Sequence, residues 1–221
     1  MKYPQGCIIQ FAKTPELGKV KTRLIPSIGA EKALALHQHF LEKTLVTCLT
    51  ANLCPVELWL SDPSSTNASI AAIAERYQPD IRWQQGEDLG ERMMHAIAAV
   101  LECYDFIILI GSDCPTLDRA YLEIAVEQLV TGEPESKAVI GPAEDGGYVL
   151  IGLRQIDPLI FSNIDWGSAQ VFEQTRQRLM QIGWNVIQLP TLWDLDRPED
   201  LARLLLPTKE IIGLNNFFDV T

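Results

Sequence analysis

Hydrophobic and polar positions along the chain form blocks of two kinds. Short, continuous apolar runs, such as those at residues 6–12 and 106–110, are typical of strands covered on both faces. Longer segments carry apolar residues at helical spacing. The pattern predicts strands at 6–12, 55–61, 80–85, 106–110, two within 137–153, and 185–190. It predicts helices at 30–49, 67–77, 86–102, 118–130, 168–183 and 197–206.

Because strand and helix alternate throughout, the sequence predicts an α/β fold: a three-layer α/β/α sandwich with a mainly parallel sheet. No repeat or linker divides the 221 residues, so we expect a single domain over residues 1–221. The end of the chain, residues 206–221, reads as a C-terminal tail. It is apolar for a free end, and we expect it to pack on the domain or on a second copy in a homodimer.

The net charge of −11 disfavours a nucleic-acid partner, because an acidic surface repels a phosphate backbone. No apolar run is long enough for a membrane span, and no cleavable leader is evident at the start, so we expect a cytoplasmic protein. Five cysteines without a CxxC spacing indicate neither a disulfide framework nor a zinc site. His37, His39 and His95 fall within predicted helices and are interpreted as structural.

Positive charge is concentrated in the loop after the first strand, in the segment KTPELGKVKTRL. This loop carries neither a dinucleotide fingerprint nor a P-loop. Lys13, Lys21 and Arg23 can still reach phosphate oxygens there, while Gly18 lets the backbone approach a ligand. If the segment is extended, Lys21 and Arg23 point to the same side. The alternative interpretation is a solvated basic loop without a ligand.

Asp113 follows the most apolar strand, in the motif GSDCP. A carboxylate at the end of a buried strand needs a cation or hydrogen bonds, and a divalent metal would satisfy it. The alternative role is as the cap of the following helix, which Thr116 or Asp118 could equally supply.

Two further acidic segments follow. The motif GPAEDGGY predicts a hairpin turn next to Asp145, at the lip of an acceptor site. In LWDLDRPEDL, Asp194 and Asp196 face one way if the segment is extended, so either can complete a metal site with Asp113. The other acid is then expected to cap the last helix.

KTPELGKVKTRL, EDLGERM, GSDCP, GPAEDGGYVLIGL and LWDLDRPEDL together resemble, in this order, a bacterial glycosyltransferase-like family. The family was formerly a domain of unknown function (DUF2064) and is related to the nucleotide-diphospho-sugar transferases. The resemblance implies the GT-A fold, Mg²⁺ or Mn²⁺ as cofactor and a nucleotide-bearing donor. By position, it assigns the donor phosphates or nucleotide to Lys13, Gly18, Lys21, Arg23, Gly90 and Arg92, the metal to Asp113, and the acceptor side to Asp145, Gly146, Gly147 and Tyr148.

Two departures from related patterns leave the reaction open. The GSDCP motif lacks a full DxD because position 111 is Gly, and the glycine-rich loop of typical nucleotidyltransferases is missing. The leading hypothesis is a metal-dependent transferase that passes a glycosyl group from a nucleotide sugar to a small-molecule acceptor, with Asp145 and Asp113 as catalytic residues. One alternative is a nucleotidyltransferase that joins an NTP to a phosphorylated metabolite and releases pyrophosphate. Another is a non-catalytic nucleotide-binding protein.

Overall fold

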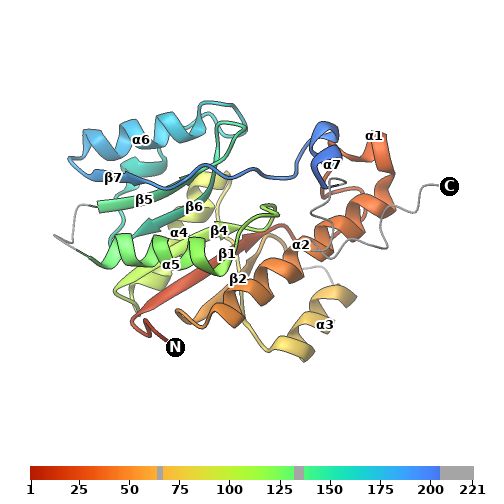
Figure 1. The fold of residues 1–221 in the computed structure, drawn as a ribbon, viewed down its shortest axis with the longest axis horizontal. Helices are drawn as coiled ribbons and strands as arrows, with labels where there is room; N and C mark the ends of the chain where they lie inside the picture. Colours follow the sequence, from red (N-terminus) through yellow and green to blue (C-terminus); the bar gives the residue numbers. More distant parts are fainter. Residues whose placement is uncertain (64–66, 132–136, 205–221) are drawn as a thin grey trace.

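A seven-stranded sheet with helices on both faces forms the protein (Figure 1). The computed structural model describes residues 1–63, 67–131 and 137–204. The strands are β1 (Gly6–Ala12), β2 (Val56–Leu60), β3 (Asp80–Trp83), β4 (Phe106–Gly111), β5 (Lys137–Pro142), β6 (Tyr148–Leu153) and β7 (Asn185–Gln188). The helices are α1 (Ile25–Ile28), α2 (Ala30–Ala51), α3 (Ala68–Tyr77), α4 (Leu89–Leu101), α5 (Arg119–Val130), the 3₁₀ helix η1 (Pro158–Phe161), α6 (Val171–Gln181) and α7 (Pro198–Leu204).

The strand order is β3-β2-β1-β4-β6-β5-β7, and β6 runs antiparallel to both of its neighbours. The other pairings, β1 with β2, β1 with β4, β2 with β3 and β5 with β7, are parallel. The sheet is therefore mainly parallel, and the predicted three-layer α/β/α fold class is confirmed.

Two apolar clusters cover the two faces of the sheet, and neighbouring residues of one strand contribute to different clusters. On β4, Ile108 belongs to the cluster with α2 and α5, whereas Ile107 belongs to the cluster with α4 and α6. Every residue of β1 is buried for the same reason. The continuous apolar runs in the sequence thus correspond to strands that are covered on both sides.

The direction of the strands decides where polar residues gather. The four strands β1 to β4 run parallel, so the residues that follow them lie on one edge of the sheet. Because β6 runs the other way, its first residue, Tyr148, lies on that same edge. Lys13, Asp113 and Tyr148 therefore meet although 135 positions separate the first from the last.

Among the described α-helices, aspartate and asparagine side chains cap three. The Asn67 side chain accepts hydrogen bonds at the start of α3, and Asp88 does so at the start of α4. At α5 the cap is Asp118, whose carboxylate accepts from the backbone N–H of Tyr121 at 2.8 Å. The alternative interpretation of Asp113 as this cap is therefore wrong, and its carboxylate is available for another role.

The basic loop differs from the extended segment assumed for it. Residues 17–24 form successive turns, and Lys21 adopts a left-handed conformation with φ of 48°. Lys21 and Arg23 consequently do not project as neighbours on one side of a strand. The predicted tail at 206–221 lies outside the described residues, so its packing stays a prediction.

Within the described ranges, no helix combines the length and apolar character that crossing a bilayer requires.

The turn between β5 and β6 depends on Gly146. Its φ is 91°, and a Cβ atom built on it would overlap the backbone of Ala169. The carbonyl of Gly146 also accepts a hydrogen bond from the N–H of Phe172 at 2.9 Å. This glycine therefore fixes the turn against the start of α6.

Substituting Gly146 by Ala should lower the free energy of unfolding by about 3 kcal/mol. The left-handed conformation costs a residue with a Cβ roughly 1–2 kcal/mol, and overpacking typically costs about 1–3 kcal/mol more. Gly183→Ala is the matched control, because Gly183 has φ of 79° but open space around it. Urea unfolding of both variants measures the difference, and equal losses would show that the Ala169 contact is unimportant.

Candidate active site

A pocket of about 640 Å³ opens at the edge of the sheet where β1 to β4 end. It takes lining residues from the end of each of these strands and from the beginning of β6: Lys13, Ser61, Gln84, Asp113 and Tyr148. Of the predicted site residues, the others that line it are Lys21, Arg23, Arg92, Asp145, Gly147, Asp194 and Asp196. The structure places Gly18, Gly90 and Gly146 outside this lining.

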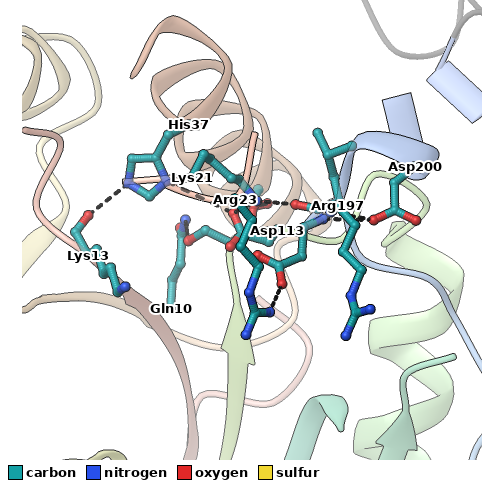
Figure 2. A network of polar contacts seen from close by, with 12 residues as sticks. Gln10, Lys13, Lys21, Arg23, His37, Asp113, Arg197 and Asp200 are labelled. Atoms are coloured by element: carbon teal, nitrogen blue, oxygen red, sulfur yellow. Dashed lines mark hydrogen bonds and ion pairs between the residues drawn. The ribbon is translucent and has the colours of Figure 1, made fainter. Parts of the chain in front are cut away.

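Lys21 points into the protein. Its side chain is only 2% exposed, and its Nζ lies 2.7 Å from Oδ1 of Asp113. The same ammonium donates a hydrogen bond to the carbonyl oxygen of Leu195 (Figure 2). The ammonium of Lys21 thus connects the basic loop to Asp113 and Leu195. Because it is buried and paired, we assign Lys21 a structural role.

The two carboxylate oxygens of Asp113 have different surroundings. Its Oδ1 is buried against Lys21, whereas the side chain as a whole remains 44% exposed, so the second oxygen is open to the pocket. Burial acts to raise the pKa of this carboxyl group, but Lys21 and His37 outweigh it and hold the pKa below its ordinary value. Asp113 is therefore a charged carboxylate with one oxygen free for a ligand.

His37 is a site residue that the sequence interpretation missed. It lies on α2 with its side chain 5% exposed, and its Nδ1 is 4.0 Å from Oδ1 of Asp113. Its Nε2 is 2.9 Å from the carbonyl oxygen of Lys13 (Figure 2). Burial lowers the pKa of the imidazole. His37 shares the apolar stripe of α2, so the periodicity signalled burial but not the neighbours.

Two cations of the pocket remain unpaired. Among the described residues, neither Lys13 nor Arg92 forms an ion pair. Arg92 donates through Nε to the carbonyl oxygen of Gly86 at 2.9 Å, which orients its guanidinium. Arg23, by contrast, pairs with Asp196. The free cationic charge of the pocket thus resides on Lys13 and Arg92.

The remaining acids of the pocket differ in their surroundings. Asp196 is bound by Arg23, and Oδ1 of Asp145 accepts from the N–H of Gly147 at 2.8 Å. Asp194 is partly buried. Its burial, and next the charge of Asp145, raise its pKa to about 6. Asp194 forms no ion pair with a described residue, and its surroundings disfavour its charged form.

In the described part of the chain, no group of three or more His, Cys, Asp or Glu side chains has the arrangement of a metal centre. A metal that the protein alone surrounds is therefore not indicated there. An ion that shares its coordination with a substrate needs fewer protein ligands.

Trp166 is a second residue that the sequence did not reveal. A Cβ built on Gly90 would lie 2.8 Å from the indole, so the missing side chain of Gly90 lets Trp166 pack on the start of α4. The indole also lies 6.2 Å, centroid to centroid, from the ring of Phe161. Trp166 lines the pocket. Gly90 therefore contributes to the site indirectly, because it leaves space for the indole of Trp166, which lines the pocket.

A family profile described as "Uncharacterized protein conserved in bacteria (DUF2064)" matches residues 44–168. This segment is more than half of the 221 residues. The chain belongs to this family. No curated protein matches it in sequence.

A crystal structure described as a "putative nucleotide-diphospho-sugar transferase from Desulfovibrio desulfuricans G20" is similar to this DUF2064 chain at 35% identity. The alignment covers 96% of this chain and 91% of that one, with a TM-score of 0.82.

Two further solved structures have a similar fold at lower identity. One is a CMP:2-keto-3-deoxy-manno-octonic acid synthetase complexed with CTP (13% identity, 93% and 99% coverage of this chain and that chain, TM-score 0.56). The other is 4-diphosphocytidyl-2C-methyl-D-erythritol synthase from Anaerococcus prevotii DSM 20548 (14% identity, 91% and 96% coverage, TM-score 0.58). At these identities the likeness establishes the fold, and the predicted GT-A-type architecture of this DUF2064 member is confirmed.

Replacing Lys21 by Met should lower the free energy of unfolding at pH 7 by about 1.5–3 kcal/mol, as expected for hydrogen bonds to charged groups. In an Asp113→Asn background the same substitution should cost less, because the partner charge is absent. Asp113 has a lowered pKa in the folded state, so its contribution is complete above the ordinary carboxyl pKa of about 3.9 and is lost as the pH falls further. A double-mutant cycle by urea unfolding at pH 7 and pH 2.5 measures the coupling energy between Lys21 and Asp113. Zero coupling at pH 7 would contradict a stabilising ion pair between them.

Replacing Asp194 by Asn should stabilise the ligand-free protein at pH 7 by about 1–2 kcal/mol, a value reduced for solvent screening. The folded pKa near 6 lies above the ordinary value of about 3.9, so the folded parent binds more protons and loses stability as the pH rises through this interval. The advantage of the variant should vanish below about pH 4. Asp196→Asn, which breaks the pair with Arg23, is the control and should not stabilise. Urea unfolding across this pH range measures both, and a pH-independent difference would contradict the assignment.

Proposed function

We propose that this protein is a transferase that binds a nucleotide sugar and passes its glycosyl group to a small-molecule acceptor. One observation carries the proposal. A pocket at the ends of parallel strands is lined by two cations that form no ion pair with a described residue, Lys13 and Arg92, and by the carboxylates of Asp113 and Asp194. The similarity to a structure described as a nucleotide-diphospho-sugar transferase supports the same class.

The cations suit the diphosphate of the donor. Lys13 follows β1 directly, and its backbone is held by His37, so its position is fixed although its ammonium is free. Arg92 has its Nε committed to Gly86, which leaves the rest of the guanidinium for a phosphate. We therefore assign the donor phosphates to Lys13 and Arg92, a smaller set than the sequence indicated. Lys21 instead has a structural role, because its ammonium binds Asp113 and the carbonyl of Leu195.

The carboxylates of the pocket fit a divalent cation that is shared with the donor. Asp113 has an open oxygen, and burial, followed by the charge of Asp145, raises the pKa of the neighbouring Asp194 to about 6. Mg²⁺ commonly uses one or two carboxylates together with substrate phosphates and water. Asp113 and Asp194 would hold the ion, which when bound would stabilise negative charge on the leaving diphosphate.

Asp145 is the residue we assign to the acceptor. The N–H of Gly147 fixes one of its oxygens, and the other can accept the proton of an acceptor hydroxyl. As that proton leaves, the hydroxyl oxygen bonds to the anomeric carbon, and the bond from that carbon to the donor phosphate breaks. The nucleoside diphosphate then departs with the electron pair, next to Lys13 and Arg92.

A donor screen tests the reaction. Nucleotide sugars and NTPs should be incubated with the protein, Mn²⁺ or Mg²⁺, and pooled alcohols and sugars. Release of nucleoside diphosphate from a nucleotide sugar, lost when EDTA is added, is the expected result. Release of pyrophosphate from an NTP would instead establish nucleotidyl transfer, and binding without any product would favour a non-catalytic protein.

Lys13→Ala should weaken binding of a nucleoside diphosphate by about 1.5–3 kcal/mol, the range for a charge-assisted hydrogen bond. Lys19→Ala is the matched control, because Lys19 lies in the same loop but pairs with Glu16 at 2.7 Å and does not line the pocket. Isothermal titration calorimetry of both variants measures the effect. Equal affinity in the parent and Lys13→Ala would remove Lys13 from the donor site.

A further inference from the structure

The backbone around Lys13 is held by side chains from distant parts of the chain. β1 ends just before this lysine, and residues 13–16 belong to no helix or strand. The carbonyl of Lys13 accepts from His37 on α2 at 2.9 Å (Figure 2), and the N–H of Thr14 donates to Oγ of Ser61 at 3.1 Å. The place from which the ammonium of Lys13 projects is therefore fixed although no regular element contains it.

Gln84 holds the other side of Lys13 from the end of β3. Its Nε2 lies 3.0 Å from the carbonyl oxygen of Ala12, 72 positions away and directly before Lys13, and 2.9 Å from that of Trp59. Both partners are carbonyl oxygens, which only accept, so both hydrogens of the amide nitrogen are committed to them. The backbone N–H of Gln84 donates to the carbonyl of Leu60 at 2.9 Å. Gln84 thus joins the ends of β1, β2 and β3 next to Lys13.

The segment that begins with Gln84 also holds Arg92, the other lining cation without an ion pair to a described residue. Gly86, two residues after Gln84, accepts a hydrogen bond from Nε of Arg92 at 2.9 Å. A Cβ built on Gly86 would lie 2.9 Å from the backbone nitrogen of Arg92, so the segment packs directly on the first turn of α4. Residues 84–86 therefore connect the two cations and set the position of one relative to the other.

Such a connection matters for the binding of an anion. If the backbone of Lys13 were free, a ligand would have to order this backbone as well as the long side chain, and the cost would reduce its affinity. With the backbone held in advance, only the side chain remains to be ordered. The carboxamide of Gln84 is uncharged and its donors are directed at the protein, so its effect on a phosphate has to pass through Lys13.

We propose that Gln84 is a positioning residue of the donor-phosphate site, whose carboxamide holds the backbone of Lys13 in place relative to Arg92. The inference rests on the proposed function for the assignment of phosphates to Lys13. It goes beyond that assignment because it names a residue whose loss weakens phosphate binding only while Lys13 is present.

Inorganic pyrophosphate tests this dependence, because it requires no base, sugar or transfer reaction. It should be titrated calorimetrically in EDTA at low ionic strength, where charge is least screened. Gln84→Met keeps the length of the side chain but removes both donors. It should weaken binding about fivefold, as expected when binding has to order additional rotamer-rich structure. In a Lys13→Ala background the same substitution should change the affinity by less than about twofold.

Lys137→Met is the matched control. Nζ of Lys137 also donates to two main-chain carbonyls, those of Gln128 and Thr131, but Lys137 does not line the pocket. This variant should lower the free energy of unfolding and leave the affinity for pyrophosphate unchanged. If Gln84→Met does not fold, Ser61→Ala replaces it, because it removes only the acceptor of the Thr14 N–H. Ser61→Ala should weaken binding about threefold, again only with Lys13 present.

Equal losses of affinity with and without Lys13 would overturn the proposal, because Gln84 would then act on the ligand directly or through general stability. Unchanged affinity in the variant tested, or the same weakening in Lys137→Met, would also overturn it. Each of these results leaves the phosphate role of Lys13 standing. If the parent does not bind pyrophosphate, or if Lys13→Ala alone does not weaken binding, the donor-phosphate assignment of the proposed function fails, and this inference fails with it.

Discussion

The arrangement of the site depends on one buried ion pair, between Lys21 and Asp113. Because the ammonium is almost fully enclosed, its charge must be matched locally, and the carboxylate of Asp113 and the carbonyl of Leu195 do so. The N–H of Leu195 in turn donates to the carbonyl of Asp113 at 2.9 Å. Three segments separated by up to 174 positions are thereby held at one point.

The Lys21–Asp113 ion pair determines which other charged side chains of the pocket lack a partner. With Lys21 directed inward and Arg23 paired with Asp196, Lys13 and Arg92 are the lining cations that form no ion pair with a described residue. The backbone hydrogen bond at Leu195 also holds the adjacent Asp194 beside Asp113. If the donor is a nucleotide sugar, as we propose, the neighbouring carboxylates Asp113 and Asp194 suit a divalent cation that is shared with its diphosphate.

The structure described as a putative nucleotide-diphospho-sugar transferase and the two structures described as a synthetase and a synthase share this fold. The fold therefore cannot distinguish glycosyl from nucleotidyl transfer, because both need a nucleotide at the carboxyl edge of a parallel sheet. The distinction depends on the side chains that line the pocket, which include Trp166 and Asp145.

Properties set by neighbours along the chain could be predicted from the sequence alone: the continuous apolar strands, the helix that ends at Tyr77, and the polar residues that follow the strand ends. The gathering of Lys13, Asp113 and Tyr148 on one edge followed from strand direction. Three other features could not be predicted in this way: Lys21 points inward, His37 lies next to the carbonyl of Lys13, and Trp166 packs on Gly90. Each of these features depends on a partner that is distant in sequence. Local periodicity predicts that a side chain is buried, but it does not predict which residues that side chain contacts. Only the tertiary structure could decide which cation supports the site and which is free to bind.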